Sequence, residues 1–182
     1  MTHEILIAGF GGQGVLSLGM TIAYAGMIEN KEISWMPSYG PEMRGGTANC
    51  IVIVSDDVIS SPIISSFDVV VATNQPSLEK FEHAVRAGGT LLYDATSILA
   101  PPKRTDIVAI GIPASAEASA MHNSRIMNMV LLGSLLAQRP VVGIDSVMGA
   151  LESVLPERYH NLLPLNEQAI RRGMELVTAV MA

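Results

Sequence analysis

Short runs of β-favouring apolar residues alternate with helical segments along most of this chain. The strand signals fall at residues 4–8, 33–36, 47–54, 67–73, 90–93 and 106–112. Apolar residues at helical spacing predict helices over residues 15–29, 75–87, 123–137, 144–155 and 165–180. Pro37 is expected to end the second strand, and Gly88-Gly89 the second helix. The alternation predicts an α/β fold with a mainly parallel, Rossmann-like sheet, flanking helices and a helical C-terminal third.

The length of 182 residues fits one domain, and we expect residues 1–182 to form a single unit. Charged residues make up only 15% of the chain, against about 25% in ordinary soluble domains, whereas apolar residues make up 49%. This balance excludes an intrinsically disordered chain. The low charge has two interpretations. Either part of the surface packs against other chains, or the 11 methionines fill an unusually complete core.

Charge also restricts the kinds of partner. The net charge is −6 and the 11 lysines and arginines are scattered, so the basic stripe of a nucleic-acid-binding protein is missing. Residues 5–28 carry no charge, but glycines interrupt this run. Residues 15–28 span only about 21 Å as a helix, against roughly 30 Å of bilayer core. No lysine or arginine precedes the run to begin a signal peptide, so we expect a cytoplasmic protein without membrane contact.

A glycine-rich sequence joins the first expected strand to the first expected helix. It matches the pattern G-x-G-x-x-G, which brings a ligand close to the backbone, and the helix start offers N–H groups to an anion. The candidate binding residues are Gly9, Gly11, Gly12, Gln13 and Gly14. A dinucleotide site also needs an acid that closes the second strand, yet Glu32 lies at the start of that strand. Three interpretations stay open: a nicotinamide or flavin site, another phosphate-bearing ligand, and packing or subunit contact alone.

A second loop, over residues 37–46, follows the second expected strand. Its two prolines and three glycines restrict the backbone, which indicates a structured loop. Loops that leave the carboxyl ends of parallel strands line one crevice, so we expect the two loops to meet. Arg44 then binds a phosphate, a carboxylate or an acidic residue of a partner, or it forms only a surface pair with Glu42. The candidate residues are Tyr39, Gly40, Pro41, Glu42, Arg44, Gly45 and Gly46.

Other residues with reactive or polar side chains give weaker patterns. The four histidines have no metal-ligand spacing, and no serine lies in the pattern G-x-S-x-G. Cys50, the single cysteine, is expected to be a small buried hydrophobe. One cysteine excludes a disulfide framework and an iron–sulfur cluster held by this chain alone. Asp94 is expected to cap a turn, and Asn128, in an otherwise apolar helix, bonds either a neighbouring backbone or a partner chain.

Taken together, residues 9–14 and 39–46 resemble the gamma subunit, or gamma domain, of the 2-oxoacid:ferredoxin oxidoreductases. This family includes the pyruvate, 2-oxoglutarate, 2-ketoisovalerate and indolepyruvate ferredoxin oxidoreductases. The similarity covers nearly the whole chain and continues through Ser61-Pro62, residues 68–73, Gly88-Gly89 and the helix that begins near Asn166. The chain looks most like a stand-alone gamma subunit of the 2-oxoglutarate type.

The resemblance implies a heteromeric enzyme. Such an enzyme converts a 2-oxoacid, coenzyme A and oxidised ferredoxin into acyl-CoA, carbon dioxide and reduced ferredoxin. Thiamine diphosphate, magnesium and iron–sulfur clusters are then held by alpha, beta and ferredoxin-like delta partner subunits. The sequence agrees with this division, since it contains neither Gly-Asp-Gly nor Asn-Asn to hold magnesium diphosphate.

On this basis the chain has no catalytic residue and is inactive alone. We expect a scaffold subunit whose two loops pack near the thiamine and coenzyme A sites of its partners. Arg44 or the N-terminus of the first helix is expected to touch a coenzyme A phosphate. The alternative is a free-standing, Rossmann-type nucleotide-binding oxidoreductase.

Overall fold

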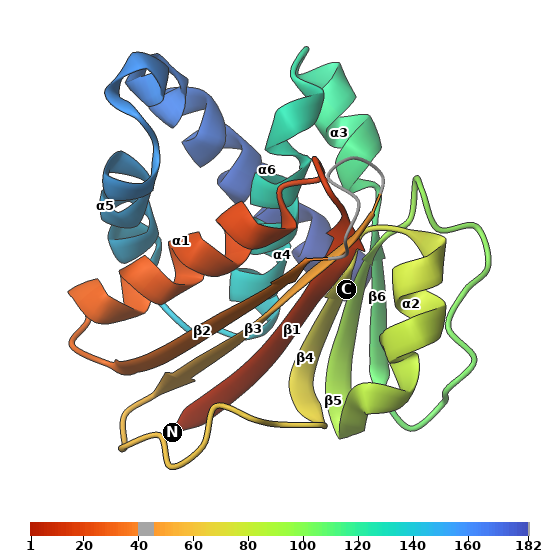
Figure 1. Cartoon of the computed structure of the whole chain (residues 1–182). Coiled ribbons are helices and arrows are strands. Elements are labelled where there is room, and N and C mark those ends of the chain that lie inside the picture. Colours follow the sequence, from red (N-terminus) through yellow and green to blue (C-terminus); the bar gives the residue numbers. More distant parts are fainter. Residues whose placement is uncertain (40–45, 182) are drawn as a thin grey trace.

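A six-stranded sheet forms the centre of the computed structural model, which describes residues 1–39 and 46–181. The strands are β1 (Thr2–Phe10), β2 (Glu32–Tyr39), β3 (Thr47–Ser55), β4 (Phe67–Ala72), β5 (Val85–Asp94) and β6 (Val108–Ile112). They lie in the order β2-β3-β1-β4-β5-β6 (Figure 1). The pairs β1–β4, β4–β5 and β5–β6 are parallel, whereas β3 is antiparallel to both of its neighbours. The predicted α/β fold with a mainly parallel sheet is confirmed.

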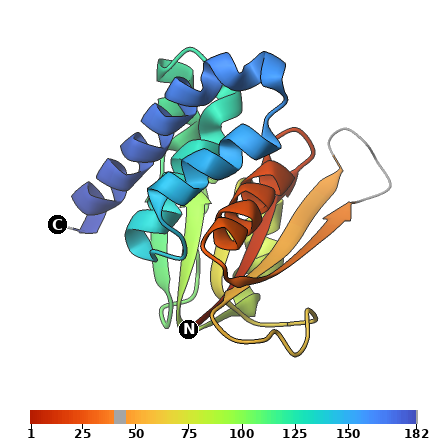
Figure 2. The same ribbon diagram turned by 90° about the vertical axis from the view of Figure 1, so that its left-hand side faces the viewer.

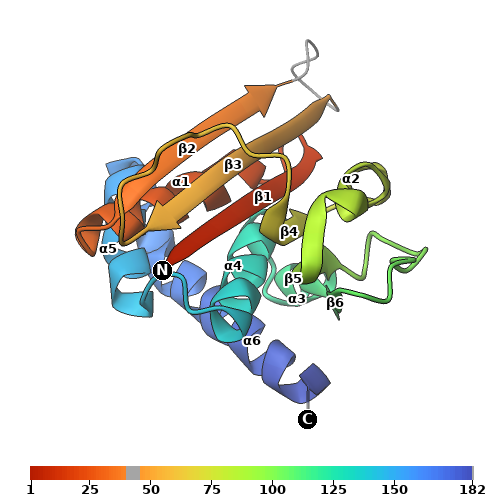
Figure 3. The same cartoon turned by 90° about the horizontal axis from the view of Figure 1, so that it is seen from below.

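Helices cover the two faces of this sheet unequally. They are α1 (Val15–Ile28), α2 (Gln75–Phe81), α3 (Ala114–Ala120), α4 (Met127–Gln138), α5 (Ile144–Val154) and α6 (Leu163–Met181), with 3₁₀ turns at Glu82–Ala84, Ser124–Ile126 and Glu157–Leu162. α2 packs on one face, and the other five helices pack on the opposite face (Figure 3). α1 lies between α5 and the edge strand β2 (Figure 2). In the described ranges, no helix is both long enough and apolar enough to span a bilayer.

Side-chain alternation along the central strands divides the apolar core between the two faces. In β1, Ile5 and Ile7 are fully buried under the five helices, whereas Leu6 is buried in the smaller cluster under α2. β4 follows the same pattern, with Val69 on the first face and Val70 on the second. A strand buried on both faces is a continuous apolar run in sequence, which explains the strong strand signal at residues 67–73.

α4 is surrounded by other parts of the same chain. Every residue from Met127 to Leu136 is buried, and the helix packs mainly against α6. A Cβ on Gly133 would overlap the carbonyl of Ile170, and a Cβ on Gly173 would overlap the carbonyl of Val130, so the two helices need glycine where they cross. The helix predicted over residues 123–137 is confirmed, although it begins at Met127 after a 3₁₀ turn. Its apolar surface is already covered here and gives no support to a partner surface.

Some element boundaries differ from the sequence-based expectations. β2 continues through Pro37 to Tyr39, because an edge strand tolerates a residue without an N–H. The helix expected over residues 75–87 ends earlier, and Gly88-Gly89 lie inside β5, where φ of 74° at Gly88 accompanies a shift in the pairing with β4. The sequence does not predict α3, since its seven Ala- and Ser-rich residues carry little apolar periodicity.

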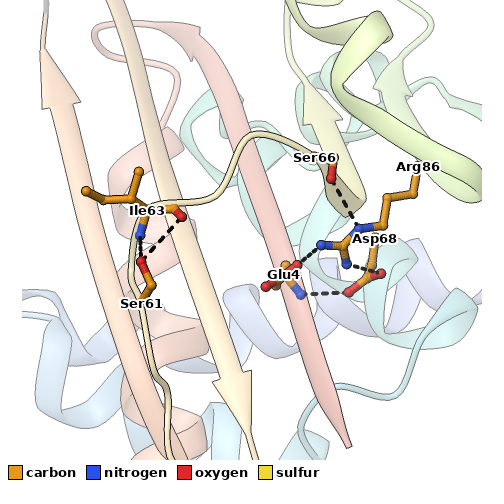
Figure 4. A network of polar contacts seen from close by, with 6 residues as sticks. All are labelled: Glu4, Ser61, Ile63, Ser66, Asp68 and Arg86. Carbon is orange, nitrogen blue, oxygen red and sulfur yellow. Dashed lines mark hydrogen bonds and ion pairs between the residues drawn. The ribbon is translucent and has the colours of Figure 1, made fainter.

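A polar network fixes the end of the sheet that lies opposite the glycine loop (Figure 4). Arg86 donates to Asp68 at 2.8 Å and pairs with Glu4, and the Glu4 N–H donates to the other oxygen of Asp68 at 2.9 Å. Hydrogen bonds to Asp68 and Glu4 raise the pKa of the Arg86 guanidinium group. The amino ends of β1, β4 and β5 are thus held together, and the loops at the carboxyl ends form the opposite edge.

Candidate functional site

The glycine loop turns the chain from β1 into α1 through two residues in the left-handed region. Gly12 has a φ of 97° and Gly14 a φ of 74°, so any other L-residue would be strained at either position. Gly14 is also the N-cap of α1, and neither a side-chain cap nor an acidic residue occupies the first turn. The N–H groups of that turn and the helix dipole are therefore available to an anion.

The side chain of Gln13 points back into the protein and holds the loop in place. Its Oε1 accepts hydrogen bonds from the Phe10 N–H at 2.7 Å, the Thr73 hydroxyl at 2.7 Å and Asn74 Nδ2 at 3.0 Å. Its Nε2 donates to the Thr73 carbonyl at 3.3 Å. Gln13 thus joins the glycine loop to the segment between β4 and α2, and the loop presents its backbone rather than this side chain.

The two glycine-bearing loops meet, as the sequence predicts. The Gly11 N–H donates to the Gly46 carbonyl at 3.0 Å, because β1 and β2 run in the same direction on either side of β3. Tyr39, at the end of β2, is 72% exposed and borders a cavity of about 350 Å³ together with Gly11. The remaining candidate residues lie outside the described ranges: Gly40, Pro41, Glu42, Arg44 and Gly45.

A larger cavity, of about 570 Å³, opens on the helical side of the glycine loop. Its walls come from Gly12 and Gly14, the start of α1, the residues around the start of α4, the end of α5, and the 3₁₀ turn that leads into α6. The polar side chains on these walls are Ser17, Thr21, Asn123, Arg125, Asn128, Tyr159 and Asn166. A space of this size accommodates a substantial part of a cofactor-sized molecule.

Asn128 connects the wall of this larger cavity to the glycine loop. Its side chain is 6% exposed, and its Nδ2 donates to the Gly14 carbonyl at 3.2 Å. A Cβ on Gly14 would come within 2.5 Å of that nitrogen, so the contact requires glycine. The sequence left two interpretations open for Asn128, a bond to a neighbouring backbone or a bond to a partner chain. In the structure Asn128 bonds to a neighbouring backbone, that of Gly14.

Arg125 brings positive charge to the same cavity. It is exposed, and no carboxylate of residues 1–39 or 46–181 lies within 4.0 Å of its guanidinium group. Together with the uncapped start of α1, it makes the cavity favourable to an anion. Arg125 carries no signal in the sequence, because no motif marks it and only the folded chain brings it to the glycine loop.

Asp94 has a structural role at the end of β5. It is fully buried, and its carboxylate accepts hydrogen bonds from the Ser97 hydroxyl at 2.6 Å, the Ser115 hydroxyl at 2.5 Å and the Thr96 N–H at 3.2 Å. These bonds close the turn after β5 and tie it to the first turn of α3. The prediction that Asp94 caps a turn is confirmed.

The single thiol does not suit a metal cluster. Cys50 is fully buried in β3, and burial raises the pKa of its thiol to about 12. Iron–sulfur clusters bind thiolates, and a protonated, enclosed thiol does not fit that chemistry. Within the part of the chain that the structure describes, no three His, Cys, Asp or Glu side chains gather as a metal site. Cys50 is the buried hydrophobe that the sequence predicts.

The sheet topology also differs from a complete dinucleotide-binding fold. In that fold the strand after the first helix lies beside the first strand and ends in the ribose-binding acid. Here β3 lies between β1 and β2, and Phe10 at the end of β1 pairs with Thr47. An acid at the end of β2 would therefore not stand at the ribose position, which disfavours a nicotinamide site.

These features define a Rossmann-like α/β domain in which a glycine loop, a helix N-terminus and an arginine meet at one cavity. The family model described as pyruvate ferredoxin/flavodoxin oxidoreductase matches residues 4–176 of the chain. The chain belongs to this family, and it corresponds to the gamma subunit of the 2-oxoacid:ferredoxin oxidoreductases.

Curated relatives match the chain over different shares of their own length. The 2-oxoglutarate synthase subunit KorC of Methanothermobacter marburgensis is 31% identical over 184 residues, which cover 97% of each chain. The ketoisovalerate oxidoreductase subunit VorA of the same organism is 45% identical over 142 residues, which cover 78% of this chain but 29% of VorA. The chain therefore spans less than a third of the length of VorA.

Two solved structures share the fold at 27% sequence identity. One is the gamma subunit of a keto/oxoacid ferredoxin oxidoreductase from Geobacter sulfurreducens, with a TM-score of 0.82 over 97% of this chain and 99% of that chain. The other is the 2-oxoglutarate:ferredoxin oxidoreductase of Magnetococcus marinus, solved with 2-oxoglutarate, coenzyme A and succinyl-CoA bound. It superposes with a TM-score of 0.89 over 98% of this chain but only 31% of that chain.

Proposed function

We propose that this chain is the gamma component of a cytoplasmic, multisubunit 2-oxoacid:ferredoxin oxidoreductase. The complete enzyme converts a 2-oxoacid, coenzyme A and oxidised ferredoxin into acyl-CoA, carbon dioxide and reduced ferredoxin. The family match over residues 4–176 supports this assignment. The iron–sulfur clusters belong on partner subunits, since the single thiol of this chain is enclosed. Thiamine diphosphate and magnesium belong there too, since the sequence contains neither Gly-Asp-Gly nor Asn-Asn to hold magnesium diphosphate. The chain itself supplies binding surface and no reacting group.

The substrate that we propose is 2-oxoglutarate. KorC from Methanothermobacter marburgensis, a 2-oxoglutarate synthase subunit, aligns over 97% of both chains, and the Magnetococcus marinus enzyme was solved with 2-oxoglutarate. The higher identity to VorA extends over a part of that subunit only, so a branched 2-oxoacid such as ketoisovalerate is the runner-up.

The observation that carries the proposal is the cavity at the start of α1. Coenzyme A bears a diphosphate and a further phosphate on its ribose, and the cavity combines a helix N-terminus with the exposed guanidinium of Arg125. Gln13 holds the glycine loop on one side, and Asn128 holds it on the other. The N–H groups are thus fixed before the ligand arrives, and little ordering free energy is lost on binding.

Steady-state kinetics of the assembled enzyme tests this role. We expect Arg125→Ala to raise the KM for coenzyme A at least about tenfold, since a hydrogen bond to a charged group contributes roughly 1.5–3 kcal/mol. The kcat at saturating coenzyme A should stay near the wild-type value. Arg44→Ala tests the arginine of the second loop in the same way. Arg171→Ala is the matched control, because that exposed arginine pairs with Glu167 on α6. Equal KM values for Arg125→Ala and the control would contradict a coenzyme A contact at this cavity.

The enzyme class is tested by purifying the chain together with its partner subunits and assaying a panel of 2-oxoacids with coenzyme A and ferredoxin. We expect the highest kcat/KM with 2-oxoglutarate and no turnover by the isolated chain. Turnover of any 2-oxoacid by the isolated chain would overturn the proposal. A calorimetric titration that detected tight NAD binding would favour the nucleotide-binding alternative instead.

A further inference from the structure

The outer side of α1 carries no charge. None of the 14 residues of this helix is acidic or basic. Its inner side, with Leu18 and Ile22, is buried in the core under the five helices. Its outer side bears apolar residues at intervals of four, four, three and one residues, which place them on one stripe: Leu16, Met20, Tyr24, Met27 and Ile28.

This stripe is open to solvent in the isolated chain. Tyr24 is 42% exposed, Met27 60% and Ile28 50%, whereas Leu16 and Met20 are half-buried. At the helix start, Leu16 borders the same small cavity as Tyr39, so that exposed tyrosine continues the apolar surface beyond the helix. We call these residues the α1 face: Leu16, Met20, Tyr24, Met27, Ile28 and Tyr39.

Comparison with α6 indicates that the α1 face is not an ordinary surface. The exposed side of α6 carries the charged residues Glu167, Arg171 and Glu175, as expected for a helix that faces water. Contacts between proteins are instead enriched in methionine and aromatic residues and depleted in charge. The composition of the α1 face matches a contact surface.

The longer relatives indicate what covers the α1 face. This chain corresponds to 31% of the Magnetococcus marinus chain and to 29% of VorA. In those proteins more than two thirds of the polypeptide lies outside this domain. The domain therefore has other parts of the same enzyme beside it. We propose that the α1 face docks the partner subunit that corresponds to the remaining sequence of these longer chains. The contact on that partner is an apolar surface with few charges. This inference rests on the proposed function.

The position of the α1 face links docking to the candidate site. The same helix starts at the larger cavity, where its first-turn N–H groups are open, and the stripe begins within that turn at Leu16. A partner seated along α1 therefore reaches the start of the helix, where Leu16 and Tyr39 border the small cavity and Ser17 also lines the larger one. The docked partner would complete the walls of a site that this chain forms only in part.

Assembly of the full chain with its alpha and beta partner subunits tests the docking. The variants are Tyr24→Glu and Met27→Glu, which place a carboxylate on the α1 face, and Leu99→Glu, a control at an 87% exposed leucine on the loop after β5. Each chain is tagged and co-expressed with the partner subunits, and the captured complex is quantified after size-exclusion chromatography. We expect a loss of complex of at least tenfold for both α1 variants and none for Leu99→Glu.

The possible outcomes separate the two proposals. If the wild-type chain assembles and the α1 variants assemble equally well, docking by the α1 face is wrong and the proposed function stands. If the wild-type chain never assembles, the proposed function fails and this inference fails with it. If the α1 variants abolish only a homodimer of this chain, a second copy covers the face and the inference is overturned. Circular dichroism of each purified chain excludes unfolding, and Tyr24→Gln and Met27→Gln replace any variant that does not fold.

Discussion

Replacing Gln13 by methionine measures the tether that holds the glycine loop. Methionine has similar length, but it offers no comparable acceptor. The Phe10 N–H and Asn74 Nδ2 then lose their partner, whereas the Thr73 hydroxyl can turn to the Ala8 carbonyl at 3.3 Å. An unsatisfied buried donor costs roughly 1–3 kcal/mol. Phe10 is only partly buried, so its N–H should cost less than the full amount. The two lost hydrogen bonds together should therefore lower the free energy of unfolding by about 3 kcal/mol.

Thermal unfolding of the purified chain provides the assay. A domain of this size loses about 2–4 °C in Tm per kcal/mol, so Gln13→Met should lower the Tm by roughly 6–12 °C. Gln168→Met is the matched control, because Gln168 is exposed on α6, and it should stay within about 0.5 kcal/mol of the wild type. A Tm for Gln13→Met that matched the control would refute the argument that these hydrogen bonds fix the loop.

The variant Gln13→Glu distinguishes the effect of Gln13 on loop stability from its effect on coenzyme A binding. A carboxylate keeps the accepted hydrogen bonds, but it turns an oxygen towards the Thr73 carbonyl in place of the Nε2 donor. We expect a stability loss of about 1–2 kcal/mol, smaller than that of Gln13→Met. The added negative charge lies beside the start of α1, so the KM for coenzyme A of the assembled enzyme should rise even where the loop stays folded.

Two further predictions concern the core. Burial raises the folded pKa of Cys50 to about 12, from about 9 when unfolded, so folding favours the protonated thiol. This contribution is complete below pH 9 and declines by about 1.4 kcal/mol per pH unit as the pH rises from about 9 towards 12. The stability difference between wild type and Cys50→Ala, measured by urea unfolding, should shrink over that range, and a constant difference would contradict the prediction. Gly133→Ala should cost at least about 3 kcal/mol, because its Cβ overlaps the Ile170 carbonyl, whereas Gly149→Ala should change stability by less than about 1 kcal/mol. Similar urea midpoints for these two variants would refute the close crossing of α4 and α6.

Local signals account for the parts of the molecule that the sequence predicts. The strand over residues 67–73 is buried on both faces, so its apolar run is visible without knowledge of the fold. The glycine loop is visible because a short left-handed turn at Gly12 and Gly14 needs glycine. The position of β3 between β1 and β2 is not local, because it depends on how the hairpin of β2 and β3 pairs with β1. The sequence therefore predicts a parallel sheet but not its antiparallel strand.

The candidate site divides in the same way. Its backbone part consists of the glycine turn and the start of α1. These lie within one continuous segment, so the sequence predicts them. Asn128 is visible as a polar residue in an apolar helix, but its partner at Gly14 is established only by packing. Arg125 has no local signal, because an exposed arginine is ordinary in sequence and only the approach of α4 to α1 brings it to the cavity.

The open start of α1 implies a conflict between stability and function that one substitution tests. Ser17 is the third residue of α1, it is exposed, and it lines the larger cavity. An acidic residue in the first turn interacts favourably with the helix dipole by about 0.3–1 kcal/mol, yet the chain has none there. Ser17→Asp should therefore raise the Tm of the isolated chain by roughly 1–4 °C. It should also raise the KM for coenzyme A of the assembled enzyme several-fold, because the carboxylate lies where we propose that a phosphate of coenzyme A binds. Ser17→Asn, which adds similar bulk without charge, should leave the KM near the wild-type value. A stabilised Ser17→Asp enzyme with an unchanged KM would show that the first turn is left open for another reason than anion binding.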